Sequence, residues 1–219
     1  MDAPALPLFS CKGKTTAVTG GSRGIGFEVS RALAEVEADV AIIYHSSPDA
    51  SATASLVAKT TGVRVQAYQP GVRSRSHISE TMEQIGKDFG HLVIVVANAG
   101  VCANVAALNV AALDYDEDSW SHFNQIKYDG AMWTVQAAGR VFKGQGRGNL
   151  IITASLSSVL CNTPHMQAGY NASKAAVAHL TRCLAVEWEE FARVNCVGPA
   201  YVNTKSMCHL PPSERPWLC

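Results

Sequence analysis

A glycine-rich turn between a β-branched run and a helical pattern constrains this chain more than any other segment. The run Thr15–Thr19 predicts a short strand, and helical spacing of apolar and charged residues extends from Phe27 to Val36. Glycines between a strand and a helix let the backbone approach a pyrophosphate, and the amide groups of the helix N-terminus donate to it. The order strand, turn, helix therefore predicts a nucleotide-binding loop; a plain glycine-rich turn is the alternative. The residues predicted to contact the nucleotide are Gly20, Ser22, Arg23, Gly24, Ile25 and Gly26.

Strand-like and helix-like segments alternate along the rest of the chain. The apolar run His91–Val96 is continuous, which is typical of a parallel strand buried on both faces. Such alternation predicts an α/β fold with a doubly wound parallel sheet between two layers of helices, a three-layer Rossmann fold, in one domain over residues 1–219. The expected strands are residues 15–19, 39–44, 63–68, 91–96, 148–153 and 193–197, and the expected helices are residues 27–36, 50–61, 78–89, 116–142 and 168–191.

The end of the second expected strand indicates which dinucleotide the chain would bind. In such folds an acidic residue at this place holds the 2′-hydroxyl of NAD, but here Asp39–Tyr44 is followed by His45, Ser46 and Ser47. The serines, together with Arg23 of the glycine turn, suit a 2′-phosphate, because a guanidinium group binds phosphate bidentately. The sequence therefore favours NADP(H) over NAD(H).

Two further groups of residues point to a site at the carboxyl edge of the sheet. Asn98 and Gly100 follow the run His91–Val96, and open α/β sheets bind ligands where such strands end. Tyr170 and Lys174 stand four residues apart in an expected helix, so they share one face. A nearby ammonium favours the ionised form of a phenol, whose pKa is ordinarily about 10. The pair predicts a proton donor or acceptor usable near neutral pH; a solvated surface pair is the alternative.

Charge and cysteine usage exclude several functional classes. Lys plus Arg and Asp plus Glu number 18 each, so a basic footprint for nucleic acid or for a membrane surface is not expected. The seven cysteines are scattered and form no Cys-x-x-Cys pair, which predicts neither a disulfide framework nor a metal site. The N-terminus lacks the pattern of a signal peptide. A cytoplasmic protein acting on a small molecule is the expectation.

Four motifs stand in the order found in the short-chain dehydrogenase/reductase family, which residues 13–205 resemble. They are Thr19-Gly20-x-x-x-Gly24-x-Gly26, Asn98-Ala99-Gly100, a serine after the fifth expected strand, and Tyr170-x-x-x-Lys174. The sequence around these motifs is most similar to the branch of NADP-dependent mannitol (polyol) dehydrogenases and sorbose or xylulose reductases. The resemblance implies hydride transfer between NADP(H) and a carbonyl or secondary alcohol of a sugar, polyol or secondary-metabolite intermediate.

The resemblance also implies a role for each motif residue. Tyr170 would donate the proton in carbonyl reduction and accept it in alcohol oxidation, while Lys174 would lower the pKa of the phenol and hold the nicotinamide ribose. Asn98 would support that ribose and the adjoining strand. Val202 and Thr204 match positions that contact the nicotinamide end. Members of the family often form dimers or tetramers through their two long helices, so a homo-oligomer is expected.

Two serines compete for the role of the hydroxyl that donates to the substrate oxygen. Ser157 precedes Tyr170 by thirteen residues, the usual spacing in the family, whereas Ser155 precedes it by fifteen but stands at the strand end. The polyol branch carries a two-residue insertion before the tyrosine, which favours Ser155. Ser157 and Ser158 are then expected to be solvent-exposed turn residues.

Four departures from the family pattern allow a second interpretation. Lys127 stands where many members have an asparagine, and Pro70-Gly71-Val72 replaces an Asp-Val at the end of the third strand. Ala200 replaces a glycine, which would cost about 1 kcal/mol if a positive φ were needed. Residues 206–219 form an atypical Pro-rich tail where members continue with a substrate-covering segment, so truncation is expected. The alternatives to a ketoreductase are a relative that binds NADP without turnover and one with non-redox chemistry.

Overall fold

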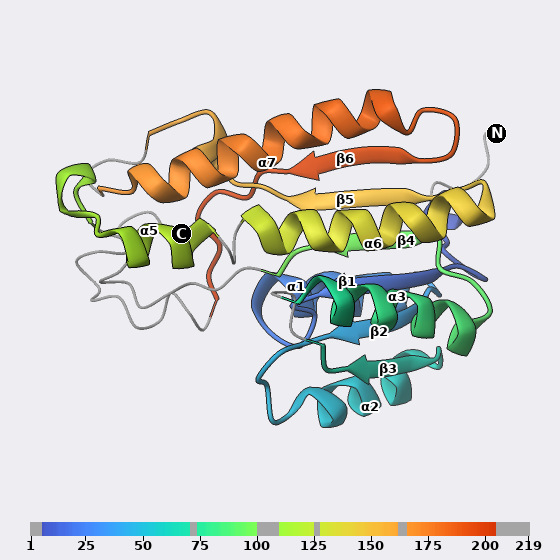
Figure 1. Ribbon diagram of the computed structural model, residues 1–219. Helices are drawn as coiled ribbons and strands as arrows, with labels where there is room; N and C mark the ends of the chain where they lie inside the picture. The colour runs from blue at the N-terminus through green and yellow to red at the C-terminus, as the bar shows by residue number, and fades with distance from the viewer. Residues whose placement is uncertain (1–5, 71–73, 100–109, 125–127, 162–165, 205–219) are drawn as a thin grey trace.

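One parallel sheet organises the molecule. The computed structural model describes residues 6–70, 74–99, 110–124, 128–161 and 166–204 (Figure 1). Within them the strand order is β3-β2-β1-β4-β5-β6, with every neighbouring pair parallel. This order confirms the predicted doubly wound Rossmann fold, and the connection reverses direction between β1 and β4. The strands are β1 (Thr15–Thr19), β2 (Asp39–Ile43), β3 (Val65–Tyr68), β4 (Ile94–Ala97), β5 (Asn149–Thr153) and β6 (Arg193–Val197).

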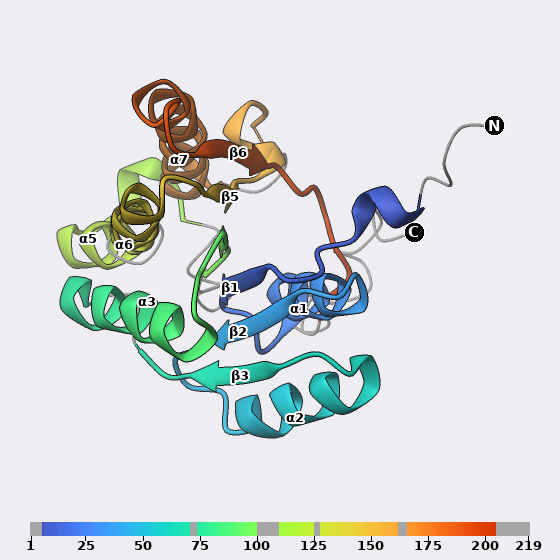
Figure 2. The same cartoon turned by 90° about the vertical axis from the view of Figure 1, so that its right-hand side faces the viewer.

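Helices cover both faces of the sheet, as Figure 2 shows. One layer holds α1 (Gly24–Glu35) and α2 (Ala50–Thr61), and the other holds α3 (Arg75–Phe89), α6 (Gly130–Gln145) and α7 (Ala168–Glu187). Each layer has its own buried core against the sheet. The shorter described elements are α5 (Glu117–Asn124), η1 (Leu6–Phe9), η2 (Ala112–Asp114) and η4 (Leu156–Ser158).

Burial on both faces explains why the strand sequences are continuously apolar. In β2, Val40 and Ile42 pack with the core under α1 and α2, while Ala41 and Ile43 pack with the core under α3, α6 and α7. All four side chains are fully buried. Successive side chains of a strand point to opposite faces, so a strand between two helical layers needs apolar residues at every position.

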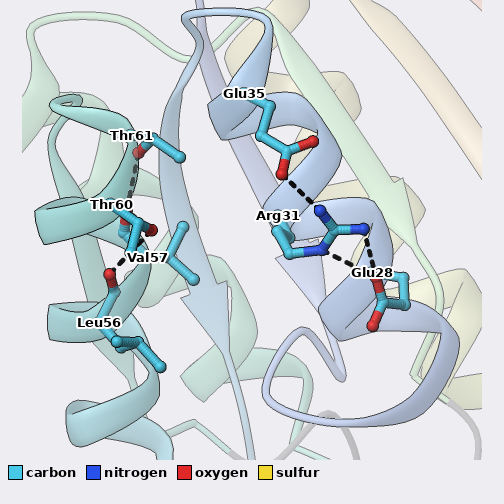
Figure 3. Close-up of polar contacts among 7 residues, drawn as sticks. All are labelled: Glu28, Arg31, Glu35, Leu56, Val57, Thr60 and Thr61. Atoms are coloured by element: carbon cyan, nitrogen blue, oxygen red, sulfur yellow. Dashed lines mark hydrogen bonds and ion pairs between the residues drawn. The ribbon is translucent and has the colours of Figure 1, made fainter.

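Local interactions stabilise the outer layer of α1 and α2, drawn in Figure 3. Arg31 pairs with Glu28 at 2.8 Å and also with Glu35, one turn along α1. In the last turn of α2, the Thr61 hydroxyl donates to the Val57 carbonyl oxygen at 2.7 Å. The ion pairs are solvent-exposed and screened by water, so they add little to the stability, and the fold depends mainly on the two cores.

Several element bounds differ from the sequence predictions. β4 begins at Ile94 instead of His91, because the backbone groups of Leu92 bond the side chain of Gln145. The N–H of Leu92 donates to the side-chain oxygen of Gln145 at 3.0 Å, and the side-chain nitrogen of Gln145 donates to the Leu92 carbonyl oxygen at 2.7 Å. Within the expected helix over 116–142 the structure describes α5 and α6, and α6 continues to Gln145, past the predicted end. The helix expected to reach Phe191 ends at Glu187, where Trp188 turns inward; a Cβ on Gly139 would lie 2.6 Å from its ring.

Candidate active site

The glycine turn between β1 and α1 is shaped for close approach of a ligand backbone. Gly20 and Gly24 have φ values of +67° and +55°, which residues with a side chain rarely adopt. Gly26 is buried, and a Cβ there would lie 2.2 Å from the carbonyl oxygen of Gly20. The turn is also tied to β2, because the N–H groups of Gly20 and Gly21 donate to the Ile43 carbonyl oxygen at 2.8 and 3.2 Å.

Asn98 joins the end of β4 to this turn. Its side-chain amide donates to the Thr19 carbonyl oxygen at 3.1 Å, and the Thr19 hydroxyl accepts from the N–H of Asn98 (3.0 Å) and of Ala99 (2.9 Å). The same amide nitrogen lies 2.5 Å from the position that a Cβ on Gly26 would take. Asn98 therefore ties the end of β4 to the end of β1 beside the glycine turn, while its contact with the cofactor ribose stays a prediction. Thr19 thus also joins the ends of β1 and β4. It is the first residue of the glycine motif, but the sequence did not indicate this role.

The N-terminus of α1 has no side-chain cap from its N-cap residue. Arg23 stands at the N-cap in an extended conformation, and its exposed side chain does not cap the helix. Uncapped amides at a helix N-terminus attract anions. Thr204 lies beside this turn, with its methyl carbon 3.8 Å from the position of a Cβ on Gly24. The segment after β6 thus returns past the start of α1.

The segment after β2 is held by a residue that the sequence did not indicate. The side-chain amide of Gln69, just after β3, donates to the His45 carbonyl oxygen at 3.0 Å, and its oxygen accepts from the Tyr44 hydroxyl at 3.4 Å. Ser46 is exposed in this segment. These bonds join the ends of β2 and β3, a contact that no local pattern predicts.

Tyr170 and Lys174 lie on one face of α7, and Lys174 reaches the end of β5. The Nζ atom of Lys174 donates to the Thr153 carbonyl oxygen at 2.7 Å and lies 6.0 Å from the centre of the Tyr170 ring. Burial lowers the pKa of the Lys174 ammonium from 10.5 to about 8. The half-buried Tyr170 thus has beside it a cation that changes charge close to neutral pH.

The serines form a compact turn after β5. Ser155 caps η4, with its hydroxyl accepting from the N–H of Ser157 at 3.2 Å and donating to the Ser157 hydroxyl at 3.1 Å. The Ser158 hydroxyl donates to the Lys174 carbonyl oxygen at 3.0 Å, which joins η4 to α7. Ser157 is only 5% exposed, so the expectation of an exposed turn residue is wrong. The Ser-x-x-Ser spacing of a capping box could have indicated this inward turn.

The structure brings most of the predicted site residues to one edge of the sheet. Ser155, Tyr170 and Lys174 gather around the end of β5, while the glycine turn and Asn98 gather at the ends of β1 and β4. Ser22 and Ile25 are half-buried within the turn region, and Val202 is 41% exposed after β6. Gly100 lies outside the described residues, so its predicted contact stays a prediction.

The departures from the family pattern provide no evidence of a damaged site. Among the described non-glycine residues, Glu37 alone has a positive φ, so Ala200 is not strained in that way. Lys127, Gly71, Val72 and residues 206–219 lie outside the described part of the chain.

The described residues contain neither a metal-binding cluster nor a membrane-spanning helix. No group of three or more His, Cys, Asp or Glu side chains there is placed to hold a metal ion. In the same residues, no helix combines the length and the apolar character required to cross a bilayer.

Comparison with known proteins identifies the family. A model of the family described as short chain dehydrogenase matches residues 14–214. The chain is 43% identical over 198 residues to a sorbose reductase of Schizosaccharomyces pombe, covering 90% of this chain and 76% of that protein. It is 41% identical over 202 residues to an NADP-dependent mannitol dehydrogenase of Hypocrea jecorina, with 91% and 74% covered. The crystal structure of an NADPH-dependent 3-quinuclidinone reductase from Rhodotorula rubra superposes with a TM-score of 0.87 at 37% identity, covering 94% of this chain and 76% of that one. With the glycine turn, the strand-end serine and the Tyr-Lys pair in place, these matches show that the chain belongs to the short-chain dehydrogenase family.

Proposed function

We propose that this protein is an NADP(H)-dependent oxidoreductase that interconverts a carbonyl and a secondary alcohol on a small neutral substrate. The substrate class is a sugar, a polyol or a related secondary-metabolite intermediate. The observation that carries the proposal is the position of Lys174, whose Nζ atom lies 6.0 Å from the centre of the Tyr170 ring and bonds the Thr153 carbonyl oxygen at the end of β5, two residues before Ser155. The glycine turn and the start of α1 lie at the same edge of the sheet. The sorbose reductase and the mannitol dehydrogenase among its relatives act on substrates of this class.

The glycine turn fits a dinucleotide. Gly20 and Gly24 adopt left-handed conformations, and the turn has no room for a Cβ at Gly26, so the backbone itself can face a pyrophosphate. Arg23 is exposed at the same place, where its guanidinium group can pair with a 2′-phosphate, and Ser46 would add a hydroxyl donor. Bound NADPH would supply the hydride. Thr204, Val202, Asn98 and Gly100 complete the proposed set of residues that hold it.

The residues of the chain would handle the proton and the developing charge. Tyr170 donates its phenolic proton to the oxygen of the carbonyl as reduction proceeds, and accepts it back in alcohol oxidation. Lys174, as an ammonium, favours the phenolate that Tyr170 becomes and donates to ribose hydroxyls. Ser155 donates a hydrogen bond to the same substrate oxygen while negative charge develops on it.

A pH dependence of cofactor binding follows from the lowered pKa of Lys174. With a pKa of about 8, the lysine is an ammonium at pH 7 and largely a neutral amine at pH 9. NADPH binds more tightly to the protein in which Lys174 is an ammonium, because the charged group forms stronger hydrogen bonds with the ribose hydroxyls. Above pH 8, NADPH binding is therefore coupled to protonation of Lys174. The dissociation constant should then rise by up to about tenfold per pH unit above pH 8. NADPH fluorescence titrations from pH 7.5 to 9.5 measure this, away from the titration of the 2′-phosphate near pH 6.

The control for this prediction is calorimetry in buffers of different ionisation enthalpy. At pH 9 the wild-type protein should take up about one proton per NADPH bound, and Lys174→Met should take up none. An affinity that stays constant from pH 7.5 to 9.5 would contradict a role for the Lys174 ammonium in cofactor binding.

The function itself is tested by the oxidation of NADPH in the presence of defined carbonyl compounds. L-Sorbose, L-xylulose and D-fructose represent the proposed class, 3-quinuclidinone represents cyclic ketones, and pyruvate represents anionic substrates. We expect turnover with at least one ketose, little with pyruvate, and a preference in kcat/KM for NADPH over NADH of roughly tenfold or more from the 2′-phosphate contacts. NADPH binding with no turnover on any of these compounds would overturn the proposal. A relative without turnover has no observation in its favour among the described residues.

We also propose a domain organisation, an oligomeric state and a cellular location for this protein. Residues 1–219 form one catalytic domain, because a single sheet includes the described strands from both ends of the chain. A homo-oligomer is supported by exposed apolar residues on α7, with Val186 73% exposed. A cytoplasmic location is supported by the free thiols of Cys11, Cys161, Cys183 and Cys196. Size-exclusion chromatography with light scattering tests the oligomeric state, and cell fractionation tests the location.

A further inference from the structure

Two hydroxyl groups, not one, are buried where the substrate oxygen is expected to bind. Ser155 and Ser157, here called the serine pair, are 9% and 5% exposed. Their Oγ atoms are 3.1 Å apart, with Ser155 as the donor, and the N–H of Ser157 donates to the Ser155 Oγ at 3.2 Å. Water has little access to such a pair, so each hydroxyl depends on protein partners for its hydrogen bonds.

The turn that carries the serine pair is anchored on two sides. The N–H of Leu156 donates to the Pro199 carbonyl oxygen at 3.0 Å, which holds η4 against the segment after β6. On the other side, Ser158 donates to the Lys174 carbonyl oxygen at 3.0 Å and its hydroxyl accepts from the N–H of Ser155 at 3.4 Å. The pair therefore has a set position relative to the helix that carries Tyr170 and Lys174.

We propose that Ser157 is a positioning residue for the reaction, which holds and polarises the hydroxyl of Ser155. A serine hydroxyl has one proton to donate and two lone pairs to accept. When Ser155 turns its proton to the substrate oxygen, Ser157 loses the donor that it had, and its own proton can turn to the Ser155 Oγ. The chain then runs from Ser157 to Ser155 to the substrate oxygen. Neither serine gains or loses a proton, and the hydrogen bond between the two hydroxyls is kept with its direction reversed.

This exchange strengthens the hydrogen bond that matters in the transition state. A hydroxyl that accepts a hydrogen bond becomes a better donor, and the effect is larger in a site from which water is excluded. The inference rests on the proposed function, because it assigns Ser155 to the substrate oxygen.

The test is a double-mutant cycle at the serine pair. The variants are Ser157→Ala, Ser157→Thr, Ser155→Ala and the double Ala variant, measured for kcat with the best ketose and for the NADPH dissociation constant. We expect Ser157→Ala to lower kcat by about 5- to 30-fold, as for the loss of one buried hydrogen bond, with unchanged NADPH affinity. Ser155→Ala should lower kcat by about 10²- to 10³-fold. The double variant should be no worse than Ser155→Ala, and Ser157→Thr should recover much of the rate.

Thr181→Val is the matched control, because Thr181 is a buried residue of α7 whose hydroxyl donates to the Val177 carbonyl oxygen at 3.0 Å, within its own helix. Its kcat should stay within about twofold of wild type. Wild-type kcat in Ser157→Ala, or additive losses in the double variant, would overturn the inference alone. A loss in Ser157→Ala as large as in Ser155→Ala would also overturn it, since Ser157 would then touch the substrate itself. A wild-type protein that turns over no carbonyl compound overturns the proposed function, and this inference with it.

Discussion

Replacing Tyr170 with phenylalanine should abolish carbonyl reduction while sparing NADPH binding. The change removes only the phenolic oxygen from a half-buried ring on α7, so the packing of the helix is retained. No other group of the proposed set replaces it, because the Ser155 hydroxyl gives a hydrogen bond to the substrate oxygen without releasing its proton. The Nζ atom of Lys174 is bonded to the Thr153 carbonyl oxygen at 2.7 Å, at the end of β5. We expect kcat to fall by about 10³-fold or more, within the range for loss of a general acid. NADPH oxidation and fluorescence titration measure the two quantities separately.

Tyr68→Phe is the control for this substitution. The Tyr68 hydroxyl donates to the carboxylate of Asp88 at 2.7 Å, at the edge strand β3 far along the sheet from β5. Its loss should lower stability slightly and leave kcat near the wild-type value. If Tyr170→Phe kept more than about a tenth of the wild-type kcat, proton transfer by Tyr170 in the rate-limiting step would be excluded.

Gly26→Ala should have the second large effect, on cofactor binding. The added Cβ would lie 2.2 Å from the Gly20 carbonyl oxygen and 2.5 Å from the side-chain nitrogen of Asn98. The first of these is backbone, so the turn must move and the bond from Asn98 to Thr19 must stretch. We expect NADPH affinity to fall by about 100-fold or more, since the phosphate contacts depend on the position of this backbone. Overpacking of this kind also costs about 1–3 kcal/mol of stability, or several degrees in Tm.

Gly86→Ala is the matched control, because the same change there meets no obstacle. Gly86 lies inside α3, and a Cβ on it would have no heavy atom within 4 Å. Alanine should stabilise the helix by about 0.5–1 kcal/mol and leave NADPH affinity unchanged. Circular dichroism reports the fold and the Tm of both variants. Wild-type NADPH affinity in a folded Gly26→Ala protein would show that the glycine turn does not hold the cofactor.

The parts of the site that sequence predicted well are those set by local spacing. Tyr170 and Lys174 share a face of α7 because residues four apart in any helix do so. The glycine turn could be placed because a strand pattern and a helix pattern flank it directly, although α1 begins at Gly24, three residues before the predicted Phe27. The bounds of α2 and β6 agree with the predicted ones for the same reason.

The residues whose environment was mispredicted, or not predicted, are those whose partners come from distant segments. Ser157 is buried because η4 is anchored to the segment after β6 and to α7, which no pattern within 156–158 reveals. The side chain of Gln145, 53 residues along the chain, bonds the backbone of Leu92 just before β4 begins. Gln69 holds His45 across two neighbouring strands.

The sequence by itself determined the α/β order, the family motifs and the preference for NADP(H), because these depend on residue types at short, regular spacings. The tertiary structure alone decided how the motifs meet: Asn98 against the glycine turn, Lys174 at the end of β5 with its pKa lowered to about 8, and the burial of the serine pair. Burial and long-range hydrogen bonds arise only when the crossover helices pack on the sheet and bring together segments that lie far apart in the chain.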